Sequence, residues 1–179
     1  MPEDLMHRRT VIGGLAGVAA LVAGGSWYVR RDGATVLDPV EVPALWSPTG
    51  DSDLYLPERG QYSIIEVFAT SCGICASMMP ELGEVADTID PATTQLVSVS
   101  IDPLGLSLDE SDIVDWWIDH GGRWPVTSDY RLDLHFTREL AVGTIPKTVV
   151  FDRSNRLITA GQGFHDADSI LRMLDEARG

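Results

Sequence analysis

Two cysteines separated by two residues, Cys72 and Cys75, are the only cysteines in a chain of 179 residues. The apolar, β-branched run 62–68 precedes the pair and is typical of a buried strand. The segment that follows, 76–90, has apolar residues at spacings of three and four, which predicts an amphipathic helix. At such a junction the free N–H groups and the helix dipole favour a thiolate at Cys72. Cys75 lies one turn further on, close enough to form a disulfide. The pair therefore predicts thiol–disulfide exchange.

The charge of the chain limits its partners and its environment. The formal net charge is −14 at pH 7, and Lys147 is the only lysine. This balance argues against nucleic acid as a partner. An acidic surface of this kind resembles that of proteins from high-salt organisms, where screening makes self-repulsion tolerable. We expect a halophilic source, although the charge says nothing about chemistry.

The N-terminal segment has the order of an export signal or a membrane anchor. A pair of arginines at 8–9 precedes an apolar run at 11–29, and two further arginines follow at 30–31. The first pair is similar to a twin-arginine export signal. At about 1.5 Å per residue, the run comes close to spanning a hydrocarbon core of about 30 Å. We expect residues 1–31 to be a retained anchor that holds the domain outside the cytoplasm. The alternative is cleavage and release.

The rest of the chain predicts one α/β domain of ordinary size. Residues 32–58 are rich in proline and are expected to be a linker and lead-in, so that the domain itself covers residues 59–179. Strands and helices then alternate, which favours a central mixed sheet flanked by helices. Strands are expected at 62–68, 94–102, 147–152 and 157–160, helices at 76–90, 109–120, 132–142 and 166–177, and a short extended piece at 124–126.

In this order the motifs resemble the thioredoxin fold, and within it the membrane-anchored TlpA/ResA-like thiol–disulfide oxidoreductases. The resemblance covers roughly residues 60–179. Besides the cysteine pair and Val67–Ser71 before it, it rests on Pro80 in the expected active-site helix, on Trp124–Asp129 and on Val142–Asp152. The helix at 109–120 and the segment after it look like the insertion of the TlpA-like group.

Two positions depart from the pattern of this family. Ser71 stands where the family usually has Trp, and the dipeptide Gly73-Ile74 lacks the usual proline. A proline in the first helical turn would pre-organise the backbone. The exchange chemistry needs neither residue, so the departures concern the redox potential and the substrate range.

The resemblance implies a two-step mechanism. The Cys72 thiolate attacks a target disulfide, and Cys75 then resolves the mixed disulfide. Pro146 matches the cis-proline of the family, which packs against the disulfide and keeps the backbone of Ile145 open to a substrate strand. Gly73, Ile74 and Ile145 are accordingly the expected substrate-binding residues.

Glu66, six residues before Cys72, falls where thioredoxins have a buried acid. A carboxyl buried there has a raised pKa and can take the proton of Cys75 as that thiol becomes a nucleophile. The alternative is a carboxylate on a solvated strand face. Ile65 and Val67 on either side favour the buried position.

The resemblance also implies protein disulfides and dithiols as substrates, such as apocytochrome c or other exported proteins, and a membrane electron donor. We expect a monomer without a cofactor or metal. A zinc site would need distant histidines in none of the usual spacings. Met78 and Met79 are more often core residues than Cu(I) ligands.

Three other functions remain as alternatives. A thiol peroxidase would have Thr three residues before its reactive cysteine, and Thr70 lies two before Cys72. A copper chaperone of the Sco type would use Cys-x-x-x-Cys and a histidine. A redox-inert binding module would not need both Cys72 and Cys75.

Overall fold

The structure is a computed structural model that describes residues 27–29, 35–105, 108–130, 140 and 142–179. Most of the predicted anchor and most of the helix expected at 132–142 lie outside the described residues. Within the described part, no helix has the length and apolar character needed to cross a membrane. The last three residues of the predicted apolar run, Trp27–Val29, form a short strand (β1) that pairs with β2 (Thr35–Leu37).

A seven-stranded mixed sheet forms the centre of the fold, in the order β4-β3-β7-β6-β5-β8-β9. The interior strand β5 is parallel to β6 and antiparallel to β8. This arrangement confirms the predicted α/β fold with a mixed sheet. The strands are β3 (Val40–Trp46), β4 (Asp53–Leu56), β5 (Tyr62–Phe68), β6 (Thr94–Ser100), β7 (Val126–Ser128), β8 (Lys147–Phe151) and β9 (Leu157–Gln162).

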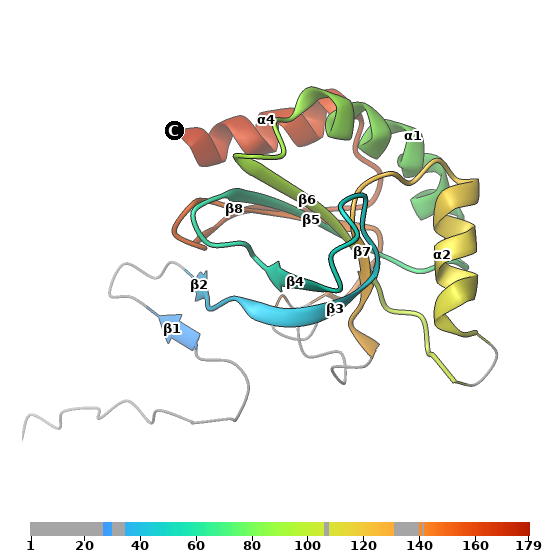
Figure 1. The fold of residues 1–179 in the computed structure, drawn as a ribbon. Helices are drawn as coiled ribbons and strands as arrows, with labels where there is room; N and C mark the ends of the chain where they lie inside the picture. The colour runs from blue at the N-terminus through green and yellow to red at the C-terminus, as the bar shows by residue number, and fades with distance from the viewer. Residues whose placement is uncertain (1–26, 30–34, 106–107, 131–139, 141) are drawn as a thin grey trace, which may run out of the picture.

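Helices α1 and α4 lie side by side over one face of the sheet, and α2 lies at one end of it (Figure 1). Their bounds are Gly73–Thr88 for α1, Glu110–Asp119 for α2 and Ala167–Arg178 for α4. Asp109 and Asp166 cap α2 and α4 through their carboxylates, as Asp and Asn residues commonly do. Pro80 lies inside α1, as predicted.

The expected linker at 32–58 contributes two strands to the main sheet. β3 pairs with β4 and also with β7, so the boundary placed at residue 59 divides the sheet and is wrong. The prolines of this segment suggested a linker, but Pro43 lies within β3 and its carbonyl accepts a hydrogen bond from Thr127 Oγ1 at 2.7 Å. Val42 and Leu56 are buried in the core, which explains why the segment is ordered against the sheet.

The core has two halves, one on each face of the sheet. The half beneath α1 and α4 includes Trp117, which is fully buried and meets Trp124 edge-on with ring centroids 4.5 Å apart. Trp116 is half-buried, and it stacks between Phe68 and His120.

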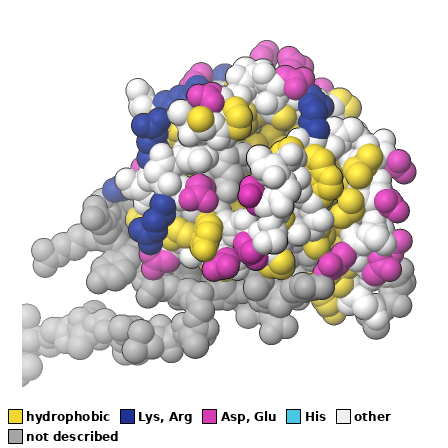
Figure 2. Space-filling view, viewed as in Figure 1, with side chains coloured by type: hydrophobic (Ala, Val, Ile, Leu, Met, Phe, Trp, Pro, Cys, Tyr) yellow, Lys and Arg dark blue, Asp and Glu magenta, His cyan; other side chains and the backbone are white. Residues whose placement is uncertain are grey.

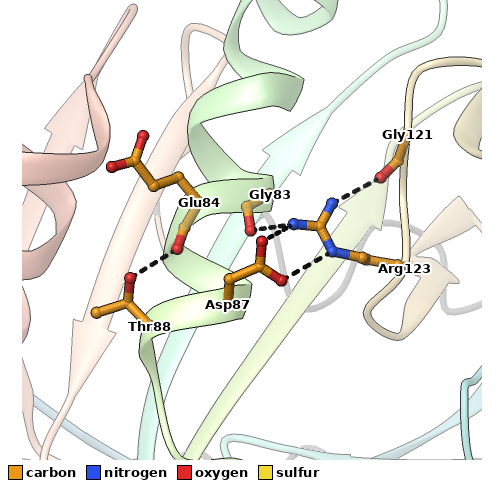
Figure 3. Close-up of polar contacts among 6 residues, drawn as sticks. All are labelled: Gly83, Glu84, Asp87, Thr88, Gly121 and Arg123. Carbon is orange, nitrogen blue, oxygen red and sulfur yellow. Dashed lines mark hydrogen bonds and ion pairs between the residues drawn. The ribbon is translucent and has the colours of Figure 1, made fainter.

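An arginine joins α1 to the loop between α2 and β7 (Figure 3). The guanidinium of Arg123 donates to both carboxylate oxygens of Asp87, at 2.5 and 3.2 Å, and to the Gly83 carbonyl at 2.6 Å. A Cβ at residue 83 would lie 2.9 Å from this guanidinium, so glycine allows the close approach. The contact fixes the far half of the helix that carries the cysteines.

The described surface is rich in carboxylates. Asp and Glu side chains are spread over the face seen in Figure 2, both at its edge and in its middle, whereas Lys and Arg gather mainly toward the left. This distribution agrees with the formal net charge of −14.

Gly122 sets the packing of Trp117 and provides a test of the core. A Cβ at residue 122 would lie 2.3 Å from the indole, which is buried and cannot move away freely. We expect Gly122→Ala to lower the free energy of unfolding by about 1–3 kcal/mol, as overpacking does. Gly143→Ala, where a Cβ meets open space, should change it by less than about 0.5 kcal/mol. Urea unfolding measures both, and equal effects would contradict the packing described.

Candidate active site

The cysteine pair lies at the junction between β5, which ends at Phe68, and α1, which begins at Gly73. Cys72 is the N-cap of the helix, and its sulfur accepts a hydrogen bond from the backbone N–H of Cys75 at 3.2 Å. The two residues form a disulfide with their Cα atoms 5.2 Å apart. Cys72 is partly exposed, whereas Cys75 is 1% exposed. Only the first sulfur is therefore open to a large partner.

A buried aspartate holds the loop that leads into the pair. Asp102 accepts hydrogen bonds from the Thr70 N–H at 2.9 Å and from the Thr70 hydroxyl at 3.0 Å. Ser100 donates a further hydrogen bond to the same carboxylate at 2.8 Å. Asp102 was not predicted as a site residue, although an acidic residue at the end of an apolar run, two residues after β6, is a signal for one. Its carboxylate fixes the backbone two residues before Cys72.

The Ile145–Pro146 peptide bond is cis, as expected from the resemblance. Pro146 is buried, and its carbonyl accepts a hydrogen bond from the Gly163 N–H at 2.8 Å. Ile145 is half-buried and packs against the same core cluster as Cys72. A second cis bond, Leu56–Pro57, was not predicted. Val67, near the end of β5 from which the chain runs to Cys72, pairs with Lys147, so the segment 145–146 lies at the same end of the sheet as the cysteine loop.

Glu66 is buried, with 1% of its surface exposed, so the alternative of a solvated carboxylate is wrong. Burial raises the pKa of Glu66 from its usual value of 4.5 to about 8, and a hydrogen bond from Ser98 opposes part of this rise. Ile64 and Phe68, two residues away on either side, pack in the core cluster that contains Cys75. Because side chains two apart on a strand share a face, Glu66 lies on the Cys75 side of the sheet.

The surface around Cys72 is open and partly apolar. Gly73 is exposed, and Ile74 is 53% exposed, which is unusual for an isoleucine. Phe164, 49% exposed, lies in the loop between β9 and α4. That loop is tied to the site on both sides, because Gly163 bonds to Pro146 and the His165 N–H lies 3.4 Å from the Met78 sulfur.

The described residues contain no group of three or more His, Cys, Asp or Glu side chains placed to hold a metal ion. Met78 and Met79 are buried at 0% and 2% exposure and pack in the core cluster around Cys75. Their positions agree with the expectation that they are core residues.

Comparison with known proteins places this geometry in a fold. No model of a known protein family matches the chain, and no curated protein matches it. Solved structures of thioredoxin-like thiol–disulfide oxidoreductases do match it, which confirms the predicted fold. The structure of StoA from Bacillus subtilis has a TM-score of 0.63 at 18% identity, and the match covers 76% of this chain and 98% of that one.

Two further structures extend the comparison. The exposed lipoprotein thioredoxin Etrx1 from Streptococcus pneumoniae has a TM-score of 0.64 at 21% identity, over 78% of this chain and 99% of that one. A secreted thiol-disulfide isomerase from Corynebacterium glutamicum has a TM-score of 0.67 at 15% identity, over 93% of this chain and 100% of that one. The identities are low, so the likeness is one of fold.

The raised pKa of Glu66 predicts an unusual pH dependence of stability. Between about pH 4.5 and pH 8 the unfolded chain loses the proton that the folded protein keeps, so stability falls as the pH rises and levels off above about 8. The fall should reach about 5 kcal/mol, since the pKa differs by about 3.5 units and one unit corresponds to about 1.4 kcal/mol. We expect Glu66→Gln to remove it.

Urea unfolding of the oxidised protein at several pH values measures this effect without titration of the thiols. Glu84→Gln, at an exposed position on α1, is the matched control and should keep the fall seen in the unmodified chain. A fall of equal size in Glu66→Gln would contradict the buried, protonated carboxyl.

Proposed function

We propose that the protein is a thiol–disulfide oxidoreductase that acts outside the cytoplasm on disulfides of other proteins. The observation that carries the proposal is the Cys72–Cys75 disulfide at the start of α1, with one sulfur accessible and the other buried. The buried acid Glu66 and the cis bond before Pro146 lie at the same end of the core. Thiol–disulfide exchange uses an accessible sulfur and a nearby proton acceptor, whereas a purely structural disulfide needs neither.

In the reduced protein, the thiolate of Cys72 attacks one sulfur of a target disulfide. The target S–S bond breaks, a mixed disulfide forms, and the leaving thiolate takes a proton from solvent. The free N–H of Cys75 and the helix dipole stabilise the Cys72 thiolate before attack. Because Cys72 is the partly exposed member of the pair, it is the sulfur that a protein substrate reaches.

Cys75 resolves the mixed disulfide. Its thiol passes a proton to the carboxylate of Glu66, and the resulting thiolate attacks the Cys72 sulfur. The second target thiolate leaves, and the Cys72–Cys75 disulfide is restored. Two electrons have moved to the target, so a dithiol donor at the membrane must reduce the pair again. A carboxyl with a pKa of about 8 suits proton exchange with a thiol.

The substrate is held next to Cys72 by its backbone and by apolar contacts. The backbone of Ile145, directly before Pro146, is the proposed pairing partner of an extended substrate strand. Gly73 leaves room for the substrate backbone, and Ile74 offers an exposed apolar side chain. Exported proteins whose cysteines need reduction, including apocytochrome c, are the proposed substrates.

The location outside the cytoplasm rests on the arginine-flanked apolar run at 11–29, which we propose as a membrane anchor. It is also the location in which protein disulfides form and persist. The acidic surface supports a high-salt environment, where screening reduces repulsion from acidic partners.

Trapping of substrates tests the proposal. Cys75→Ser removes the resolving thiol, so mixed disulfides between Cys72 and target proteins should accumulate in the membrane fraction of cells that express the full chain. Cys72→Ser is the matched control and should accumulate far fewer, since Cys75 is buried. Non-reducing electrophoresis and mass spectrometry detect the adducts. The same absence of adducts from both variants would contradict the exchange mechanism.

A further inference from the structure

Seven buried side-chain polar atoms among the described residues have no hydrogen-bond partner. Three of them, Glu66 Oε2, Thr148 Oγ1 and His165 Nε2, belong to residues on one face of the main sheet. A buried polar atom left unpaired costs about 1–3 kcal/mol. Their grouping here therefore calls for a physical reason.

Strand register shows that the first two of these atoms are neighbours. Glu66 is the direct partner of Thr148 across the β5–β8 pair, so both side chains lie on the same face of the sheet. Val150, two residues along β8, packs in the core cluster of Cys75, which identifies this face as the one beneath α1 and α4. On the other side, Glu66 pairs with Ser98, whose hydroxyl accepts a hydrogen bond from Trp124 at 3.0 Å.

His165 Nε2 extends this pair of residues into a row across the sheet, from Glu66 on β5 through Thr148 on β8 to His165 beside β9. Thr148 pairs with Gly161 of β9, and a Cβ built on Gly161 would lie 2.2 Å from His165 Nε2. The imidazole of His165 therefore occupies the place that a side chain at 161 would take, directly beside Thr148. Partner Cβ atoms in a sheet are about 4.5–5.5 Å apart. The side chains of Glu66, Thr148 and His165 are therefore neighbours on this face.

His165 also reaches the surface. The residue is partly exposed, although its Nε2 atom is buried. The row thus begins at a fully buried carboxyl on the Cys75 side of the sheet and ends at the side chain of a partly exposed residue. Histidine suits such a position, because its ring can accept a proton at one nitrogen and release one from the other.

We propose that His165 is the outer end of a proton path that starts at Glu66, passes Thr148 and is completed by buried water. The proposal rests on the function proposed above. A carboxyl that holds a proton can accept the proton of Cys75 only after it has lost the first. That proton moves to water, past the Thr148 hydroxyl, and onto His165 Nε2, while the ring releases a proton to solvent from its other nitrogen. Glu66, now ionised, then takes the proton of Cys75.

Other charged groups around this path have partners of their own. Asp166 caps α4, and Glu81 of α1 accepts a hydrogen bond from the Ala167 N–H at 3.0 Å. Arg172 of α4 donates to Ser169 at 2.7 Å. Lys147, next to Thr148 on β8, extends to the opposite face of the sheet, where its Nζ donates to the Leu140 carbonyl at 2.7 Å.

A single-turnover reaction with an aromatic disulfide, Ellman's reagent, tests the path in the full chain. The first thionitrobenzoate released reports attack by Cys72, and the second reports resolution by Cys75. We expect His165→Ala and Thr148→Val to slow the second release about tenfold or more at neutral pH and to leave the first within about twofold. Free imidazole should restore the second release in His165→Ala and have no effect on Thr148→Val.

Matched controls separate the path from general damage. His120→Ala removes a histidine that bonds to Trp116 of α2, and Thr94→Val removes a buried, unpaired hydroxyl at the other end of the sheet. Both should behave like the unmodified protein. A second release within about twofold of the unmodified rate in His165→Ala would overturn the path, as would a slow release that imidazole does not restore. If the unmodified protein shows no second release, the proposed function fails as well.

Discussion

The hydrogen bond from the Cys75 N–H to the Cys72 sulfur is the interaction on which the site depends. It exists because Cys72 is the N-cap of α1, and the helix begins there because the preceding loop is fixed. Asp102 holds that loop through Thr70, and β5 supplies it from the centre of a seven-stranded sheet. The sulfur most exposed to a partner is therefore also the one that receives the free N–H groups of the helix.

Burial gives Cys75 and Glu66 roles that differ from that of Cys72. Cys75 and Glu66 are shielded from solvent on the same side of the sheet, which keeps the second sulfur for reactions within the molecule. The same burial raises the pKa of Glu66 toward the range of a thiol, and it also removes the carboxyl from direct exchange with water. A route for its proton then becomes a requirement, and the row of unpaired atoms through Thr148 to His165 lies where that route is needed.

Much of this could be predicted from the sequence, because the decisive patterns were local. The β-branched run before Cys72 and the helical spacing after it predicted β5 and α1, and the resemblance to the thioredoxin fold predicted the cis bond. Non-local contacts were harder to predict. The segment of β3 and β4 looked like a linker and lead-in because prolines lie within and around it. Its place in the main sheet depends on the pairing of β3 with β7, which is distant in sequence. His165 had no partner pattern, since its neighbour Thr148 is adjacent only through strand register.

Selective alkylation of the reduced protein tests the central claim most directly, namely that the fold activates one sulfur and shields the other. Iodoacetamide is added over a range of pH, and mass spectrometry locates the modified cysteine. The account predicts that Cys72 is alkylated first, with a midpoint below the usual thiol pKa of about 8.5, while Cys75 stays largely unmodified. Equal rates at the two cysteines, or a Cys72 midpoint at or above about 8.5, would contradict it.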